Sequence, residues 1–119
     1  MHNFKELKVW KMSIELTKLV FELTRSFPNE HKFGLSNQLF RCAVSIPSNI
    51  AEGYGRSSTL SYMNFIKISR GSLYELETQL ILAKRLNFIA NDTLYDSIIS
   101  LIAEEGKMIN TLLNKLKSK

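Results

Sequence analysis

The residues best able to do chemistry are polar side chains in the middle of the chain. One stripe, with spacings of four, four and three along a predicted helix, contains Arg41, Ser45, Asn49 and Glu52. The next predicted helix carries a second polar group: Arg70, Ser72, Glu75 and Glu77. If the two helices run antiparallel, these groups pair in a hydrogen-bond network that fixes helix register. A ligand pocket and simple exposure to solvent are the alternatives.

Other arrangements that support catalysis or ligand binding are incomplete. Cys42 has no histidine near it in sequence and falls on an apolar stretch of the second predicted helix, so we expect a buried small side chain and not a nucleophile. Gly53 and Gly55 follow no strand and precede no Gly-Lys-Ser/Thr, which excludes a phosphate-binding loop. His2 and His31 are far apart, and neither shares a helical face with the cysteine. We therefore expect no catalytic residue, no metal and no cofactor.

Composition limits the class of protein. The chain has 119 residues, 45% of them apolar and 23% charged, which fits a single globular domain over residues 1–119. No apolar run reaches the length of about 18 residues that a membrane span needs. The single cysteine and an N-terminus without an apolar segment favour the cytoplasm. A net charge of +5 permits a polyanionic partner.

Helical periodicity predicts an all-α fold. Apolar residues recur every three to four positions between sparse glycines and prolines, and no segment alternates as a strand would. Four helices are expected, at about residues 3–25, 35–52, 58–87 and 92–116. Asn3, Ser57 or Ser58, and Asn91 or Asp92 are the expected N-caps of the first, third and fourth helices.

Pro47 lies inside the second predicted helix. Its ring removes one backbone hydrogen bond and clashes with the carbonyl of Ala43, so we expect a kink there. The hydroxyls of Ser45 and Ser48 flank the break. We expect them to bond to the freed backbone groups.

Two faces are predicted for the first helix. A charged stripe with mostly alternating signs is expected to face water and pair along the helix: Lys8, Lys11, Glu15, Lys18, Glu22 and Arg25. The other side is expected to enter the core, with Trp10, Ile14 and Phe21 beside Leu16, Leu19, Val20 and Leu23.

The fourth helix carries two apolar stripes about 100° apart, which is more than a monomeric bundle needs. We expect one stripe to serve the bundle and the other to contact a second copy, because exposed apolar patches mark interfaces. A broad core face with a tolerated glycine is the alternative. The predicted oligomer contacts are Tyr95, Ile99, Ile102, Gly106, Ile109 and Leu113.

Two sequence segments resemble a known family. SIPSNIAEG at residues 45–53 and GSLYELETQL at residues 71–80 are similar to the signature segments of the four-helix bundle proteins encoded in 23S ribosomal RNA intervening sequences. The opening FKELKVW and the residues from Phe27 to Leu35 also resemble that family, whereas Cys42 and Ser69 depart from its usual residues. The predicted structural signature is Arg41, Ser45, Pro47, Asn49, Glu52, Gly53, Arg70, Gly71, Ser72, Glu75 and Glu77.

The resemblance implies an up-down antiparallel four-helix bundle, with the second helix kinked by proline. It also implies a ring-like homopentamer, similar to the accessory variability determinant of diversity-generating retroelements, which works with a reverse transcriptase and nucleic acid. It implies no established function.

We therefore expect a non-enzymatic, oligomeric, basic protein associated with nucleic acid, either RNA such as ribosomal RNA or a nucleic acid of reverse transcription. The alternative is an interaction scaffold that presents a ring-like oligomer to a partner enzyme. No membrane partner is expected. The predicted nucleic-acid contacts are cations unpaired within their own helices: Arg56, Lys84, Arg85, Lys115, Lys117 and Lys119.

Overall fold

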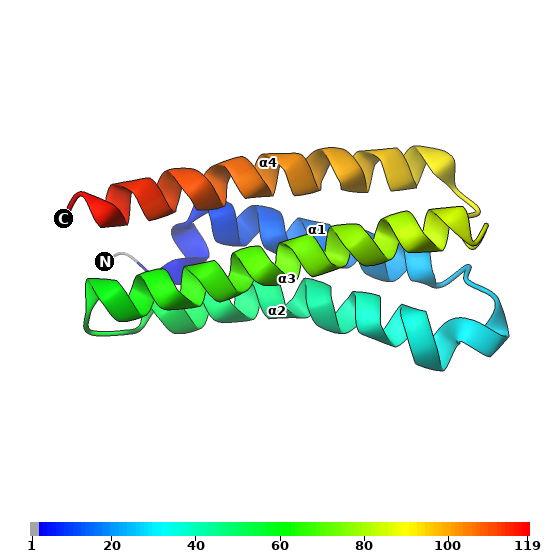
Figure 1. The fold of residues 1–119 in the computed structure, drawn as a ribbon, viewed down its shortest axis with the longest axis horizontal. Helices are drawn as coiled ribbons and strands as arrows, with labels where there is room; N and C mark the ends of the chain where they lie inside the picture. Colours follow the sequence, from blue (N-terminus) through cyan, green and yellow to red (C-terminus); the bar gives the residue numbers. More distant parts are fainter. Residues whose placement is uncertain (1–2) are drawn as a thin grey trace.

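The computed structural model describes residues 3–119, apart from the side chains of residues 31–33. Its four long helices are α1 (Lys8–Thr24), α2 (Asn37–Tyr54), α3 (Thr59–Arg85) and α4 (Asp92–Lys117). They run alternately up and down the long axis of a bundle that measures 46 × 24 × 23 Å, and both chain ends lie at the same end of it (Figure 1). No strand occurs in the described part of the chain. The predicted all-α antiparallel bundle is confirmed.

Local capping chemistry sets two helix starts. The Ser58 hydroxyl accepts a hydrogen bond from the Ser61 backbone N–H at 3.1 Å, and α3 begins directly after it. The Asn91 side chain accepts from the Leu94 N–H at 2.9 Å and caps α4. Of the alternatives that the sequence left open, Ser58 and Asn91 are therefore the caps.

The segments before α1 and α2 differ from the prediction. Asn3 caps only a short 3₁₀ helix, Phe4–Glu6, and Leu7 is extended, so α1 is a separate helix that starts one residue later. The predicted loop before α2 is instead wound into a 3₁₀ turn, Asn29–His31, and a π-helical turn, Lys32–Ser36. Pattern reasoning finds long helices but misses these single turns, because their hydrogen bonds span different intervals.

The core face of α1 is narrower than predicted. Leu16, Val20 and Leu23 are buried, as expected. Ile14 and Phe21 are 42% and 50% exposed, so their assignment to the core is wrong. They lie to one side of the buried stripe, where no neighbouring helix covers them fully.

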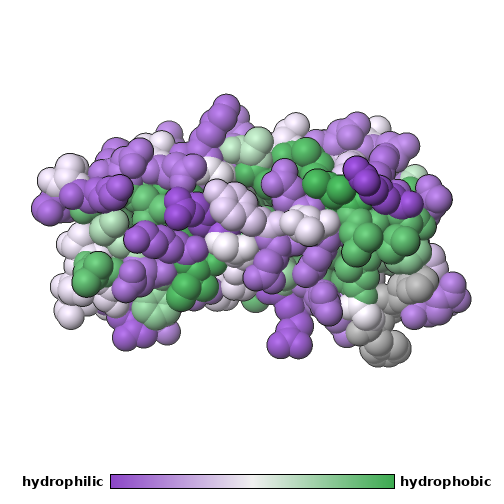
Figure 2. Space-filling view, viewed as in Figure 1, coloured by the Kyte–Doolittle hydropathy of each residue, from purple (hydrophilic) through white to green (hydrophobic). Residues whose placement is uncertain are grey.

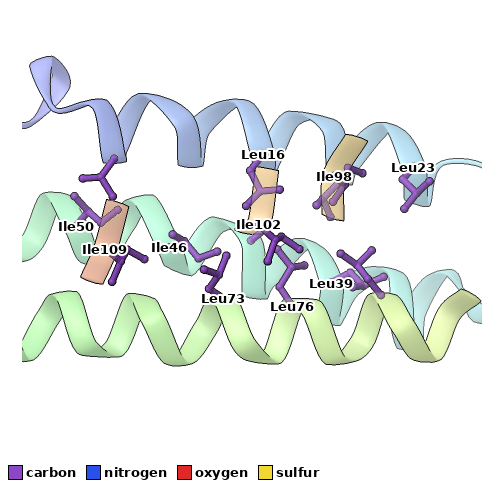
Figure 3. Close-up of a cluster of buried hydrophobic side chains, with 14 of the residues drawn as sticks. Leu16, Leu23, Leu39, Ile46, Ile50, Leu73, Leu76, Ile98, Ile102 and Ile109 are labelled. Carbon is purple, nitrogen blue, oxygen red and sulfur yellow. The ribbon is translucent and has the colours of Figure 1, made fainter. Parts of the chain in front are cut away.

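The predicted oligomer stripe of α4 faces inward. Four of its six residues are buried in the core of the same chain: Tyr95, Ile102, Ile109 and Leu113. Figure 3 shows Ile102 and Ile109 among core side chains from other helices. Ile99 is half-buried, and a methyl group at Gly106 would lie 3.7 Å from Leu73 Cδ2, an ordinary contact within the chain. The interface prediction for this stripe is wrong, because α4 turns it toward its own bundle.

α2 continues as a helix on both sides of Pro47. The proline lacks the N–H that would bond to the Ala43 carbonyl, and the Thr17 hydroxyl of α1 lies 3.1 Å from that oxygen as a donor. The same hydroxyl is 2.8 Å from Ser13 O in its own helix, so its one proton is shared. The expectation that Ser45 or Ser48 supplies this bond is wrong. A neighbouring helix does so instead.

Gly53 lets the last turn of α2 approach α3 closely. A methyl group at this position would lie 2.7 Å from Phe65 Cβ and 3.2 Å from the Tyr62 carbonyl oxygen. Both distances are too short for ordinary packing, and one of the atoms belongs to the backbone. The glycine is therefore required by the contact between the helices.

We predict that Gly53→Ala lowers the free energy of unfolding by about 1–3 kcal/mol, because the helices must separate to admit the methyl group. Gly106→Ala is the matched control. A methyl group at Gly106 would lie 3.7 Å from Leu73 Cδ2, an ordinary contact, so this change should raise stability by about 0.5–1 kcal/mol through helix propensity. Denaturant unfolding of both variants measures the difference. A Gly53→Ala protein as stable as the parent would contradict the close approach.

Candidate functional site

The polar cluster predicted between the second and third helices is formed in part. Ser45 Oγ of α2 and Ser72 Oγ of α3 lie 2.8 Å apart. Asn49 Nδ2 donates to Ser45 O at 2.8 Å and to Ser45 Oγ at 3.0 Å. These three half-buried side chains bond to one another across the contact between the helices. These hydrogen bonds hold α2 and α3 in register against each other.

Two further pairs of residues connect α2 and α3. Ser69 is fully buried and its hydroxyl donates to Ile46 O at 3.0 Å, a role that its place on the inward stripe did not reveal. Cys42 Sγ lies 3.7 Å from Glu75 Oε2. Burial, and after it the neighbouring carboxylate of Glu75, raise the pKa of the Cys42 thiol. The thiol therefore stays protonated at neutral pH, which makes it a poor nucleophile.

The remaining charged members of the predicted signature lie outside the network. Glu52 pairs with Arg56 at 3.7 Å, and both side chains are exposed. Arg70 donates to Asn110 Oδ1 of α4 at 3.1 Å. Arg41 is exposed and Glu77 half-buried, and neither bonds to another residue of the described part of the chain. The structure therefore brings together the neutral polar residues and not the charged ones.

The predicted nucleic-acid contacts divide between the two ends of the bundle. Arg56 and the lysines at the end of α4 lie at one end, and Lys84 and Arg85 at the other (Figure 1). Lys84 Nζ forms an ion pair with Asp92 Oδ1 at 2.6 Å, and the Arg56 guanidinium, besides its pair with Glu52, lies over the Phe65 ring at 4.7 Å. The expectation that Arg56 is unpaired within its helix is wrong, and Lys84 is paired across the turn between α3 and α4.

A set of exposed cations that the sequence did not group lies where α1 packs beside α4. Two shallow grooves there, of about 300 and 360 Å³, are lined by four lysines with Met108 between them. We call these four residues the α1–α4 seam: Lys8, Lys11, Lys107 and Lys115. Glu15 and Glu104 also line the grooves, yet no ion pair joins the four lysines to any described residue. The predicted pairing of Lys8 and Lys11 along α1 is therefore wrong.

The outward side of α3 carries exposed apolar side chains among polar ones such as Lys67 and Glu75. Ile68, Tyr74 and Leu82 are each about half exposed, and their spacing places them around Gly71 on the side away from the core. In the view of Figure 2, hydrophobic surface gathers in two regions with hydrophilic side chains between them. A glycine in the middle of an exposed helix costs about 1 kcal/mol, and no contact within the chain requires Gly71.

Residues 3–119 contain no group of three or more His, Cys, Asp or Glu side chains placed to hold a metal ion. No helix in this part of the chain is both long and apolar enough to cross a membrane.

Glu105 is the most perturbed titratable group. It is fully buried in α4, and neither carboxyl oxygen has a hydrogen-bond partner among the described residues. Burial raises the pKa of Glu105 to about 8, so the carboxyl is protonated at neutral pH. It lies on the inward stripe between Ile102 and Ile109, which are core residues in Figure 3. That spacing could have identified it from sequence. Since substrate cannot reach it there, its effect is on stability.

The chain is similar to one known protein family and to a solved structure. The family model described as "23S rRNA-intervening sequence protein" matches residues 5–111. A crystal structure from Bacteroides thetaiotaomicron, described as a protein with unknown function from the S23 ribosomal protein family, is similar, with 28% identity and a TM-score of 0.80. The match covers 89% of this chain and 95% of that one. No curated protein matches the chain.

We predict that stability falls as pH rises, through Glu105. Below its usual pKa of 4.5 the folded and unfolded chains both hold this proton, and up to about pH 8 only the folded chain does. Unfolding then releases a proton, which lowers stability by about 1.4 kcal/mol per pH unit in that window. Glu105→Gln should remove this slope.

The exposed neighbour Glu104 provides the control, since Glu104→Gln should keep the slope of the parent. Denaturant unfolding between pH 5 and 8 measures all three proteins. A Glu105→Gln protein with the slope of the parent would show that this carboxyl is not the group responsible.

Proposed function

Since the chain belongs to the 23S rRNA-intervening sequence protein family, we propose that it is a non-enzymatic, self-associating protein that binds nucleic acid. The expected class of nucleic acid is RNA, either ribosomal RNA or an RNA related to reverse transcription. The observation that carries the nucleic-acid part is the α1–α4 seam. Its exposed lysines have no counter-charge within 4 Å in the described chain, so phosphates can replace the counterions around them.

The proposal of a non-enzymatic role rests on the environment of the reactive groups. The Cys42 thiol is held protonated, and the Glu105 carboxyl is sealed in the core. The Ser45, Asn49 and Ser72 side chains use their hydrogen-bonding groups on one another. None of these groups is both activated and accessible, as a nucleophile or general base must be.

Self-association is assigned to the outward side of α3 in this proposal. Gly71 lowers helix stability without a benefit inside the chain, and the exposed side chains of Ile68 and Tyr74 flank it. A second copy packed there would cover both side chains, and the missing Cβ would admit its backbone closely. The assembly implied by the family resemblance is a ring of five copies. We also include in the proposal a bend at Pro47 that shapes the bundle for this contact.

A second candidate function is a scaffold for a partner protein. An apolar groove of about 310 Å³ between α1 and α2 favours it, with Ile14, Val44 and Pro47 among its lining residues. A partner with an exposed apolar side chain would fit this groove, and the basic surface would attract an acidic protein. Genomic neighbourhood separates the two: a gene within a ribosomal RNA intervening sequence favours RNA, and a gene beside a reverse transcriptase favours the scaffold.

We predict that the protein binds a structured RNA with an affinity that falls steeply with salt. Lys107→Gln/Lys115→Gln should reduce the slope of log affinity against log salt by about 1 to 2, because each lost phosphate contact removes about 0.9. The control, Lys18→Gln/Lys67→Gln, has the same net charge but leaves the seam intact. An affinity that is absent at low salt would contradict the nucleic-acid function, and equal slopes for the two variants would contradict the seam.

We predict that Gly71→Gln converts the assembly to single chains, because a long side chain keeps the second backbone away. The single chain should lose no stability, since glutamine is the better helix former. Ser100→Gln, at an exposed position on α4, is the control and should leave the mass unchanged. Light scattering gives the mass and circular dichroism the helicity. An unchanged mass for Gly71→Gln would remove α3 as the interface.

A further inference from the structure

A cleft lies where the end of α1 meets the start of α2, away from the α1–α4 seam. It has a volume of about 420 Å³, which is within the range of small-molecule sites. Its lining combines two aromatic rings, a cation and neutral polar groups: Phe21, Thr24, Arg25, Ser36, Asn37 and Phe40. This combination is absent from any single stretch of the sequence, because α1 and α2 each supply part of it.

The two rings offer stacking surface. Phe21 is 50% and Phe40 39% exposed, although they contact each other edge to face with centroids 5.6 Å apart. A flat aromatic group can therefore stack on the uncovered ring surface. Proteins that bind single-stranded nucleic acid use such exposed rings as platforms for bases.

Two polar residues of the cleft, Ser36 and Arg25, have bonding capacity that a ligand could use. Ser36 is only 8% exposed, and its hydroxyl has no hydrogen-bond partner among the described residues. Rotation about χ1 would turn this unpartnered hydroxyl toward the cleft, where a ligand could supply its missing bond. Arg25 is exposed and forms no ion pair with another residue of the described chain. Its guanidinium is suited to a phosphate.

We propose that this cleft binds one base of a single-stranded nucleic acid together with an adjoining phosphate. The base stacks on Phe21, the more exposed of the two rings, its polar edge bonds to Ser36 Oγ, and Arg25 binds the phosphate. An apolar side chain from a second copy would fill the cleft but leave the Ser36 hydroxyl unpaired and cover Arg25 without a counter-charge. A duplex keeps its bases stacked inside and cannot insert one.

This inference deepens the proposed nucleic-acid function and rests on it. The test is fluorescence anisotropy with a labelled oligouridylate, which has no stable duplex, beside a labelled RNA duplex of the same length. Phe21→Leu should weaken single-strand binding about 5- to 100-fold and leave duplex binding unchanged, because leucine keeps the apolar surface but removes the ring. Phe21→Trp should restore it. Ile14→Ala, which removes exposed apolar surface two turns away on α1, should change neither affinity.

Three outcomes would overturn the inference. If Phe21→Leu binds the single strand within twofold of the parent while the parent binds both probes, the cleft is not the base site, although nucleic-acid binding stands. If Phe21→Leu instead lowers the mass in solution with both affinities unchanged, the cleft is an interface between copies. If the parent binds neither probe at low salt, the proposed function fails together with the inference.

Discussion

The hydrogen bond from Thr17 to the Ala43 carbonyl is the contact that compensates for a proline inside α2. Pro47 deprives that carbonyl of its partner within α2, and the replacement donor comes from α1. Ser69 of α3 donates to the carbonyl of Ile46, the residue before Pro47. The turn of α2 around Pro47 is therefore tied to α1 through Thr17 and to α3 through Ser69.

This use of the signature residues leaves the outer surface for function. The hydroxyls and the amide of the contact between α2 and α3 bond to one another, and Gly53 is needed for the close approach of the two helices. Gly71 has no such internal purpose. The proposed functions accordingly use three separate surfaces: the α1–α4 seam for duplex or structured RNA, the outward side of α3 for a second copy, and the cleft between α1 and α2 for an unpaired base.

The sequence predicted what depends on local chemistry and missed what depends on tertiary neighbours. The Ser58 and Asn91 caps follow from their own turns, so they were predictable. Apolar periodicity predicts two adjacent stripes on α4, but it does not tell which stripe faces the bundle. Ile109 was therefore wrongly assigned to the outer surface. The contact between Phe21 and Phe40 could not be predicted from local sequence, because the two rings lie in different helices and meet only in the folded bundle.

The central claim is that α1 compensates for the proline in α2, and a double-mutant cycle between Thr17→Val and Pro47→Ala tests it most directly. Thr17→Val should cost about 1–3 kcal/mol in the parent, since it leaves the Ala43 carbonyl unpaired. It should cost about 1 kcal/mol less with Ala at position 47, where a backbone N–H again reaches that carbonyl. The bond from Thr17 to Ser13 is lost in both backgrounds and cancels. Equal costs in the two backgrounds would contradict the claim.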